Sequence, residues 1–156
     1  MTSHARIVRD TIDAAALLAR VSRGANGALI LFVGIVRDVN DGRGVTGIEY
    51  SAYEAMARSE LEAIAAECTA RFGADVAVEH RLGELAIEEA SVAIAVGHAH
   101  RGEAYDASRW VIEELKRRVP IWKREHYVDG TRDWVDPTGR AIADPDASAV
   151  AAPAGR

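Results

Sequence analysis

Continuous and alternating runs of apolar residues along the chain predict several β-strands. Residues 27–36 (GALILFVGIV) are apolar on both faces and rich in β-branched side chains, which is typical of a central strand covered on both sides. The Asn, Asp and Gly residues of 37–44 suit a turn, so we expect residues 27–36 and 46–53 to form a long hairpin. Alternating polarity predicts the other strands, at residues 5–12, 76–83 and 91–100, with a short acidic connection at 84–90.

Three other stretches have the spacing of amphipathic helices. The first helix is predicted to begin after Asp13, whose carboxylate suits an N-cap, and to end by Gly24. A second helix at residues 54–73 is predicted to end at Gly73, with one apolar stripe made of Leu61, Ile64, Ala65, Cys68 and Phe72.

The third predicted helix spans residues 102–119. Pro120 ends it, because proline lacks the amide hydrogen and clashes with the preceding turn. Its inner stripe is predicted to consist of Ala104, Ala107, Val111 and Leu115. Residues 136–156 are rich in Ala, Pro, Asp and Gly and have no apolar period, so we expect one domain at 1–135 followed by a flexible tail.

Composition and charge narrow the possible functions. The chain is 49% hydrophobic, 28% charged and has a net charge of -5, which does not imply a general affinity for nucleic acid or anionic membranes, so any anion site must be local. Residues 27–36 are about half as long as a membrane-spanning helix, and Asp10 and Asp13 interrupt what would be a signal peptide, so we expect a cytoplasmic protein. The single cysteine, Cys68, excludes an internal disulfide and fits core packing better than a reactive thiol.

The segment LKRRVPIWKREH (115–126) gathers five cations in twelve residues of this acidic chain. The helical period places Lys116 at the edge between core and water, and it directs Arg117 and Arg118 into solvent. Pro120 then turns the chain, which we expect to bring Lys123 back toward Lys116, with Ile121 and Trp122 as buried anchors. Two neighbouring, partly desolvated lysines lower at least one pKa, so such a lysine can both bind phosphate and move a proton.

Histidines and arginines at strand ends are the other candidates. His98 and His100 could begin a metal site, but no third ligand is evident, and His98 fits a structural role better. His100 and Arg101 lie at a strand-to-helix junction, where helix amides and a guanidinium favour an anion. Arg37 follows the apolar run and marks either the point where a strand meets water or a pocket at its end.

Several of these segments together resemble one known family. The strand GALILFVGIVRD with its Asn-Asp-Gly loop, the segment HRLGEL, the junction AHRGEAYDA and the stretch ELKRRVPIWKRE are similar to the large, catalytic subunit of molybdopterin synthase. The resemblance covers about residues 25 to 135. It implies an α/β (α+β) fold of the hammerhead type, with a helix-covered mixed sheet and a second small sheet.

The resemblance also implies a reaction and a set of partners. Sulfur would pass from the thiocarboxylated Gly-Gly C-terminus of a small ubiquitin-like subunit to cyclic pyranopterin monophosphate, forming the dithiolene of molybdopterin without any metal or other cofactor. Two large subunits would form a homodimer within a heterotetramer. The family's catalytic lysines match Lys116 and Lys123, and its substrate-binding residues match Arg37, His100, Arg101, Arg124 and Glu125. His100 and Arg101 would serve either their own site or that of the neighbouring protomer.

Two alternatives remain at this point. A non-catalytic module could bind RNA or another anion through the basic segment, which would require exposed aromatic residues among the cations and affinity that falls steeply with salt. A scaffold could also keep the dimer and partner surfaces without turnover, although the presence of both lysines favours an enzyme.

Overall fold

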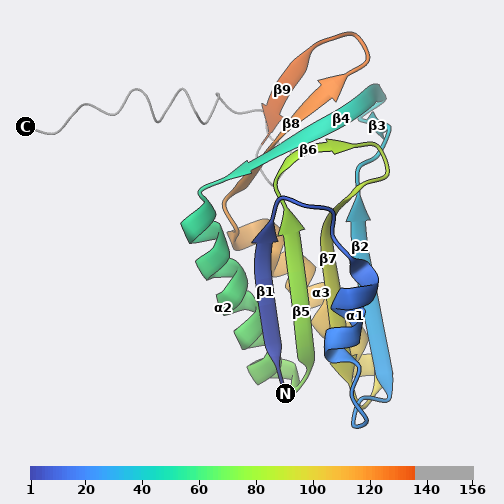
Figure 1. Ribbon diagram of the computed structural model, residues 1–156, viewed down its shortest axis with the longest axis vertical. Helices are drawn as coiled ribbons and strands as arrows, with labels where there is room; N and C mark the ends of the chain where they lie inside the picture. Colours follow the sequence, from blue (N-terminus) through green and yellow to red (C-terminus); the bar gives the residue numbers. More distant parts are fainter. Residues whose placement is uncertain (136–156) are drawn as a thin grey trace, which may run out of the picture.

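The computed structural model describes residues 1–135 as two β-sheets and three helices (Figure 1). The predicted tail at residues 136–156 lies outside the described residues. The elements in chain order are β1 (Ser3–Val8), α1 (Ala14–Val21), β2 (Ala28–Ile35), β3 (Val39–Asn40), β4 (Arg43–Ala52), α2 (Glu54–Phe72), β5 (Asp75–Arg81), β6 (Gly83–Ala86), β7 (Ala90–His98), α3 (Arg101–Arg118), β8 (Ile121–Tyr127) and β9 (Arg132–Val135). The predicted α+β architecture, a helix-covered mixed sheet with a second small sheet, is confirmed.

The larger sheet has the strand order β1-β5-β7-β2, in which β1 and β5 are parallel and the other pairs are antiparallel. Helix α1 covers one face, and α2 and α3 cover the other (Figure 1). The main core lies beneath α2 and α3, where Leu61, Ile64 and Val111 are fully buried against β5 and β7. No helix within residues 1–135 combines the length and apolar character needed to cross a membrane.

Local signals placed the helices correctly. The Asp13 carboxylate accepts a hydrogen bond from the backbone N–H of Ala16 at 3.0 Å, so it caps α1 as predicted, although α1 ends at Val21, before Gly24. Gly73 ends α2 with φ 66°, a left-handed conformation that glycine adopts without strain. The four residues of the predicted inner stripe of α3 are all buried.

The predicted central strand is instead an edge strand. β2 pairs only with β7 among the described strands, and its other edge has no partner. Its large apolar side chains are between 36% and 52% exposed at Leu29, Leu31, Phe32, Val33 and Ile35. The prediction was wrong because an apolar run indicates only that a strand is buried in the final assembly. It does not indicate whether the same chain or another one buries it.

The predicted hairpin of residues 27–36 and 46–53 was also wrong. β4 belongs to the small sheet, which lies at one end of the larger sheet (Figure 1), and there it pairs with β3, β6 and β8. The acidic connection at residues 84–90 contains β6, and the first strand is β1 at Ser3–Val8 instead of residues 5–12. The alternation of polarity located these strands, but it carries no information about their partners.

Candidate active site

The candidate active site lies where the two sheets meet beneath the end of α3. Lys116 is on the last turn of α3, the helix ends at Arg118, and β8 begins at Ile121 directly after Pro120. This reversal brings Lys123 to the same pocket as Lys116, as the sequence predicted. Arg37 and Glu125 also line this pocket.

The electrostatic environment of Lys116 suits proton transfer. Surrounding protein atoms lower the pKa of its ammonium group, and the positive charges of Lys123 and Arg37 lower that pKa further. The predicted effect of paired lysines is therefore present at Lys116. Lys116 is nevertheless exposed at the mouth of the pocket, so its side chain can reach a substrate.

Lys116 and Lys123 are the only two lysines in the 156-residue sequence, and every other basic residue apart from histidine is arginine. Arginine cannot lose its proton at physiological pH, whereas lysine can when its surroundings lower its pKa. Both lysines of the sequence line this one pocket.

Glu125 lies inside the pocket wall and holds Lys123. Its side chain is 2% exposed, and Lys123 Nζ lies 3.1 Å from its Oε1 atom. Asn40 Nδ2 donates to its two carboxylate oxygens at 3.0 and 2.9 Å, and the Tyr127 hydroxyl donates at 2.7 Å. Burial alone would raise the pKa of Glu125, but these three partners outweigh burial and leave that pKa below its ordinary value. Glu125 is therefore a buried anion that orients Lys123.

Arg37 lies on the rim of the same pocket, which decides between the two interpretations of this residue. Its Nη2 atom lies 3.4 Å from Asn40 Oδ1, and Asn40 in turn donates to Glu125. The Arg37 side chain is exposed, so most of its hydrogen-bond donors remain available to an anion.

Arg124 does not join the lysines. Side chains alternate along β8, so Lys123 and Glu125 face the pocket while Arg124 faces the opposite side of the small sheet. There its guanidinium pairs with Glu49 and stacks over the Trp134 ring at 5.0 Å. The resemblance grouped Arg124 with the substrate-binding residues because it is adjacent to Lys123 in the sequence. The pleat of β8 directs its side chain away from the pocket.

His100 and Arg101 lie at the other end of α3 from Lys116. Both are exposed beside Gly27 and Ala28, at the start of β2. The fifteen residues from Arg101 to Lys116 span roughly 22 Å of helix, so the two groups do not meet within one chain. His98 accepts a hydrogen bond from the backbone N–H of His100 at 3.0 Å, which is the structural role expected for it.

Two further expectations for the basic segment were wrong. Arg118 is not solvated: it bridges the two helices on one face of the sheet by ion pairs with Glu60, Glu67 and Glu114. Trp122 is half-buried instead of fully buried, and it packs edge-to-face on the exposed Tyr53 at 4.9 Å. Arg117, with a side chain that is 69% exposed, faces solvent as predicted.

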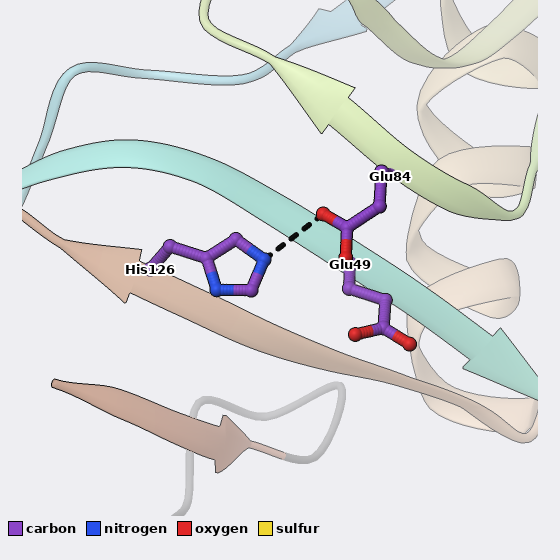
Figure 2. Close-up of side chains that lie close together, drawn as sticks. All are labelled: Glu49, Glu84 and His126. Atoms are coloured by element: carbon purple, nitrogen blue, oxygen red, sulfur yellow. Dashed lines mark hydrogen bonds and ion pairs between the residues drawn. The ribbon is translucent and has the colours of Figure 1, made fainter. Parts of the chain in front are cut away.

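One group of possible metal ligands lies on the outer face of the small sheet (Figure 2). The ligand atoms of Glu49, Glu84 and His126, from β4, β6 and β8, lie within 4.8 Å of one another. Glu84 and His126 point toward each other, 2.9 Å apart, and Glu49 is paired with Arg124. Each carboxylate already has a partner, so we interpret this group as an ion-pair network that joins three strands.

Sequence reasoning missed several residues of the pocket. Asn40 was assigned to a turn and Tyr127 to an uninterpreted segment, yet both bond to Glu125. Tyr50 and His80 line the inner part of the pocket from different sheets. No local signal marks them, because they come together only through the packing of the two sheets.

The fold and the pocket indicate a class: an α+β subunit with a pocket between its two sheets, where two lysines and an arginine gather positive charge that suits an anionic ligand. The MoaE protein family matches residues 7–118. A molybdopterin synthase catalytic subunit of Emericella nidulans is 42% identical over 132 residues (84% of this chain, 68% of the relative), and one of Synechococcus elongatus is 50% identical over 111 residues (70% and 67%).

Solved structures agree with the sequence matches. Molybdopterin synthase from Staphylococcus aureus superposes with a TM-score of 0.78 at 35% identity, covering 83% of this chain and 94% of that one. A complex of subunits 1 and 2 of the molybdopterin-converting factor from Helicobacter pylori 26695 gives a TM-score of 0.67 at 26% identity, covering 82% and 87%. The chain belongs to the MoaE family.

Proposed function

We propose that the pocket between the two sheets transfers sulfur to cyclic pyranopterin monophosphate, as the catalytic site of molybdopterin synthase. The chain is a sulfurtransferase of molybdenum cofactor biosynthesis by its family and its relatives. The observation that carries the site assignment is that Lys116, Lys123 and Arg37 converge on one pocket of an acidic protein. A phosphorylated substrate and a thiocarboxylate donor are both anions, and such a pocket attracts both.

The two lysines have different surroundings and therefore different proposed roles. Lys116 has a lowered pKa, so it reaches its neutral form more readily and suits the general base. Lys123 is paired with the buried Glu125, which suits it to hold a positive charge against the substrate and to supply a proton. Arg37 on the rim is the proposed anchor for the phosphate.

The sulfur itself would arrive on the partner subunit. Cys68 is fully buried, and burial raises the pKa of its thiol to about 12, so it does not form a thiolate at neutral pH. A thiocarboxylate on a Gly-Gly C-terminus brings its own nucleophilic sulfur. The Helicobacter pylori relative, solved as a complex of two subunits, supports a partner of this kind.

We further propose that two copies of the chain form a homodimer through β2, the core of a heterotetramer with two small subunits. The β2 edge that has no partner among the described strands, together with its exposed apolar side chains, gives a second copy both hydrogen-bonding groups and a surface to cover. Closed dimers have twofold symmetry, and a twofold axis across this edge pairs the two β2 strands antiparallel.

Antiparallel pairing would complete the active site. His100 and Arg101 lie beside Ala28 at one end of β2, and Arg37 follows Ile35 at the other end. In such a dimer, the Ala28 end of one copy lies beside the Ile35 end of the other. His100 and Arg101 would then reach the neighbour's lysine pocket, which explains why they lie far from the lysines of their own chain.

The decisive test is reconstitution. The purified chain is incubated with the pyranopterin precursor and a thiocarboxylated small subunit, and the dithiolene product is measured. We expect product with the wild-type chain and none with the Lys116→Ala/Lys123→Ala double variant; absence of product with the wild type, under conditions where a known synthase is active, would refute the assignment. The RNA-binding alternative predicts salt-sensitive retention of RNA in a filter-binding assay, and the pairing of Arg118 and Arg124 with glutamates weighs against it.

A further inference from the structure

His80 is a buried histidine that the proposed reaction does not yet use. It lies near the end of β5, is 5% exposed, and faces the same side of the sheet as Val78, beneath α3. Its ring packs edge-to-face on Tyr50 with centroids 5.3 Å apart. A buried imidazole ring destabilises the fold unless its nitrogen atoms have hydrogen-bond partners.

The contacts of His80 fix its tautomer. Nδ1 lies 3.0 Å from the carbonyl oxygen of Arg81, which can only accept, so Nδ1 carries the proton and donates. Nε2 is therefore the acceptor nitrogen. Burial lowers the pKa of His80 to about 4, with a smaller contribution from the charge of Lys116, so the ring is neutral near pH 7. A neutral imidazole with a free acceptor atom neither binds phosphate by charge nor supplies a proton.

A small cavity lies beside the His80 ring. His80 lines this space together with Tyr50 of β4, Ser91 of β7, Lys116 of α3 and Lys123 of β8. Its volume is about 80 Å³. A cavity of about 150 Å³ holds one benzene ring, so this space is small for a pterin and suits a lysine amine or an ordered water.

We propose that His80 is a positioning residue for Lys116: its Nε2 atom accepts a hydrogen bond from the Lys116 side-chain nitrogen, directly or through one water. This inference rests on the proposed role of Lys116. Lysine has a flexible four-carbon stem and three rotatable donors, so its nitrogen is poorly placed unless an acceptor fixes it. The Ser91 hydroxyl proton is engaged, since it is donated to the carbonyl oxygen of Gly34 at 3.3 Å, and Lys123 is paired with Glu125. Nε2 of His80 is the nitrogen acceptor that lines the same cavity as Lys116, beside the hydroxyl oxygens of Tyr50 and Ser91, and the His80 variants distinguish it from them.

The first test needs no variant of His80. Nitrogen-15 NMR of the histidine rings reports the tautomer and the hydrogen bonding of each nitrogen. We expect the Nδ1–H tautomer at His80, and a change in the Nε2 resonance in Lys116→Ala but not in Arg117→Ala, the adjacent solvent-facing position. An Nε2–H tautomer, or an Nε2 resonance that ignores Lys116→Ala, would overturn the proposal.

The second test measures Lys116 directly. Since the sequence has two lysines, lysine-specific ¹⁵N labelling gives two side-chain signals that can be titrated without substrate. His80→Phe keeps a stacking ring but removes the acceptor, so the ammonium form loses a hydrogen bond and the Lys116 pKa falls by about one unit. His80→Gln places an acceptor near the Nε2 position, so the Lys116 pKa should return most of the way to its wild-type value. His4→Phe, on β1, is the matched control.

Activity assays then separate positioning from simple structural support. We expect kcat to fall about tenfold in His80→Phe and to recover in His80→Gln, with folding checked by thermal melting. Equal losses in both variants with an unchanged Lys116 titration would mean that His80 only supports the fold, and would refute the proposal. Because the titrations use no substrate, they are informative even if the reconstituted reaction fails.

Discussion

The ammonium group of Lys123 lies 3.1 Å from Oε1 of Glu125, whose side chain is 2% exposed and also accepts hydrogen bonds from Asn40 and Tyr127. A buried carboxylate with three partners is held rigidly, and it holds Lys123 in turn. The position of Lys123 thus depends on residues from two strands: Asn40 of β3, and Glu125 and Tyr127 of β8.

Replacing Glu125 with glutamine should therefore affect both stability and turnover. The amide fills the same space but carries no charge, so we expect a loss of about 1–3 kcal/mol in the free energy of unfolding. Turnover should fall about tenfold, because Lys123 is no longer fixed. Chemical denaturation and the reconstituted assay measure the two effects, and Glu84→Gln, with a side chain that is 65% exposed, is the control.

The same substitution predicts a pH dependence. The pKa of Glu125 is lower in the folded protein than in the unfolded chain, so its contribution to stability is fully present above the ordinary glutamate pKa. That contribution is lost as the pH falls through the lowered folded value. The stability difference between wild type and Glu125→Gln should shrink in acid. A difference that stays constant from neutral pH to pH about 3 would contradict this account.

Exchange of lysine for arginine should separate charge from proton transfer. Arginine keeps the positive charge but does not lose its proton near neutral pH. We expect Lys116→Arg to lower kcat at least about tenfold, and Lys123→Arg to lose less because its charge is retained. Arg117→Lys is the control, since that side chain faces solvent. Near-normal turnover of Lys116→Arg would exclude Lys116 as a general base.

Mixed dimers can test whether the site is shared. Lys116→Ala and Arg101→Ala should each be inactive alone. If the site combines residues of both copies, a mixed dimer carries both substitutions in one site and none in the other, so mixing should restore about a quarter of wild-type activity. Failure to restore any activity, while mass spectrometry shows mixed dimers, would place the complete site within one chain.

A substitution on the exposed face of β2 tests the proposed homodimer in a second way. Leu31→Glu puts a charge on the proposed interface, where it cannot be buried without cost. We expect this variant to run as a monomer in sedimentation experiments and to lose turnover. Thr46→Glu, an exposed position on β4 far from β2 in the pairing order, should remain a dimer.

Replacing Arg118 should change the stability of the protein but not its turnover. It joins α2 and α3 through three glutamates, whereas Arg117 pairs only with Glu114 on its own helix. Because these glutamates are partly solvated, we expect Arg118→Met to cost about 1 kcal/mol in the free energy of unfolding. Arg117→Met should stay within about 0.5 kcal/mol of wild type. Both should retain normal turnover, and a loss in Arg118→Met at full stability would require a different role for this residue.

The helices and the lysine pair could be predicted from the sequence because their signals are local. Asp13, Gly73 and Pro120 mark helix ends by chemistry that acts within one or two turns, and Pro120 also brings Lys123 back toward Lys116. Partial burial and a like-charge neighbour at such a return then predict a lowered pKa, and burial is the larger cause of the lowered pKa of Lys116.

The remaining features depend on contacts between distant segments. The apolar run of β2 predicted a covered strand, but the sequence does not state which chain covers it. His80 and Tyr50 meet only where the two sheets pack, and the pleat of β8 turns Arg124 away from Lys123. Strand pairing and strand register decide these positions, and neither is visible in the alternation of polarity alone.

One edge of β2 has no partner strand within residues 1–135, and this edge also affects the protein before it assembles. An open strand edge flanked by apolar side chains is a template on which other extended chains can add, including unfolded copies of the same protein. A newly made protomer that waits alone is thus exposed to aggregation in proportion to its concentration. Rapid pairing of this edge protects the chain, so conditions that slow assembly should lower the yield of folded protein before they affect its catalysis.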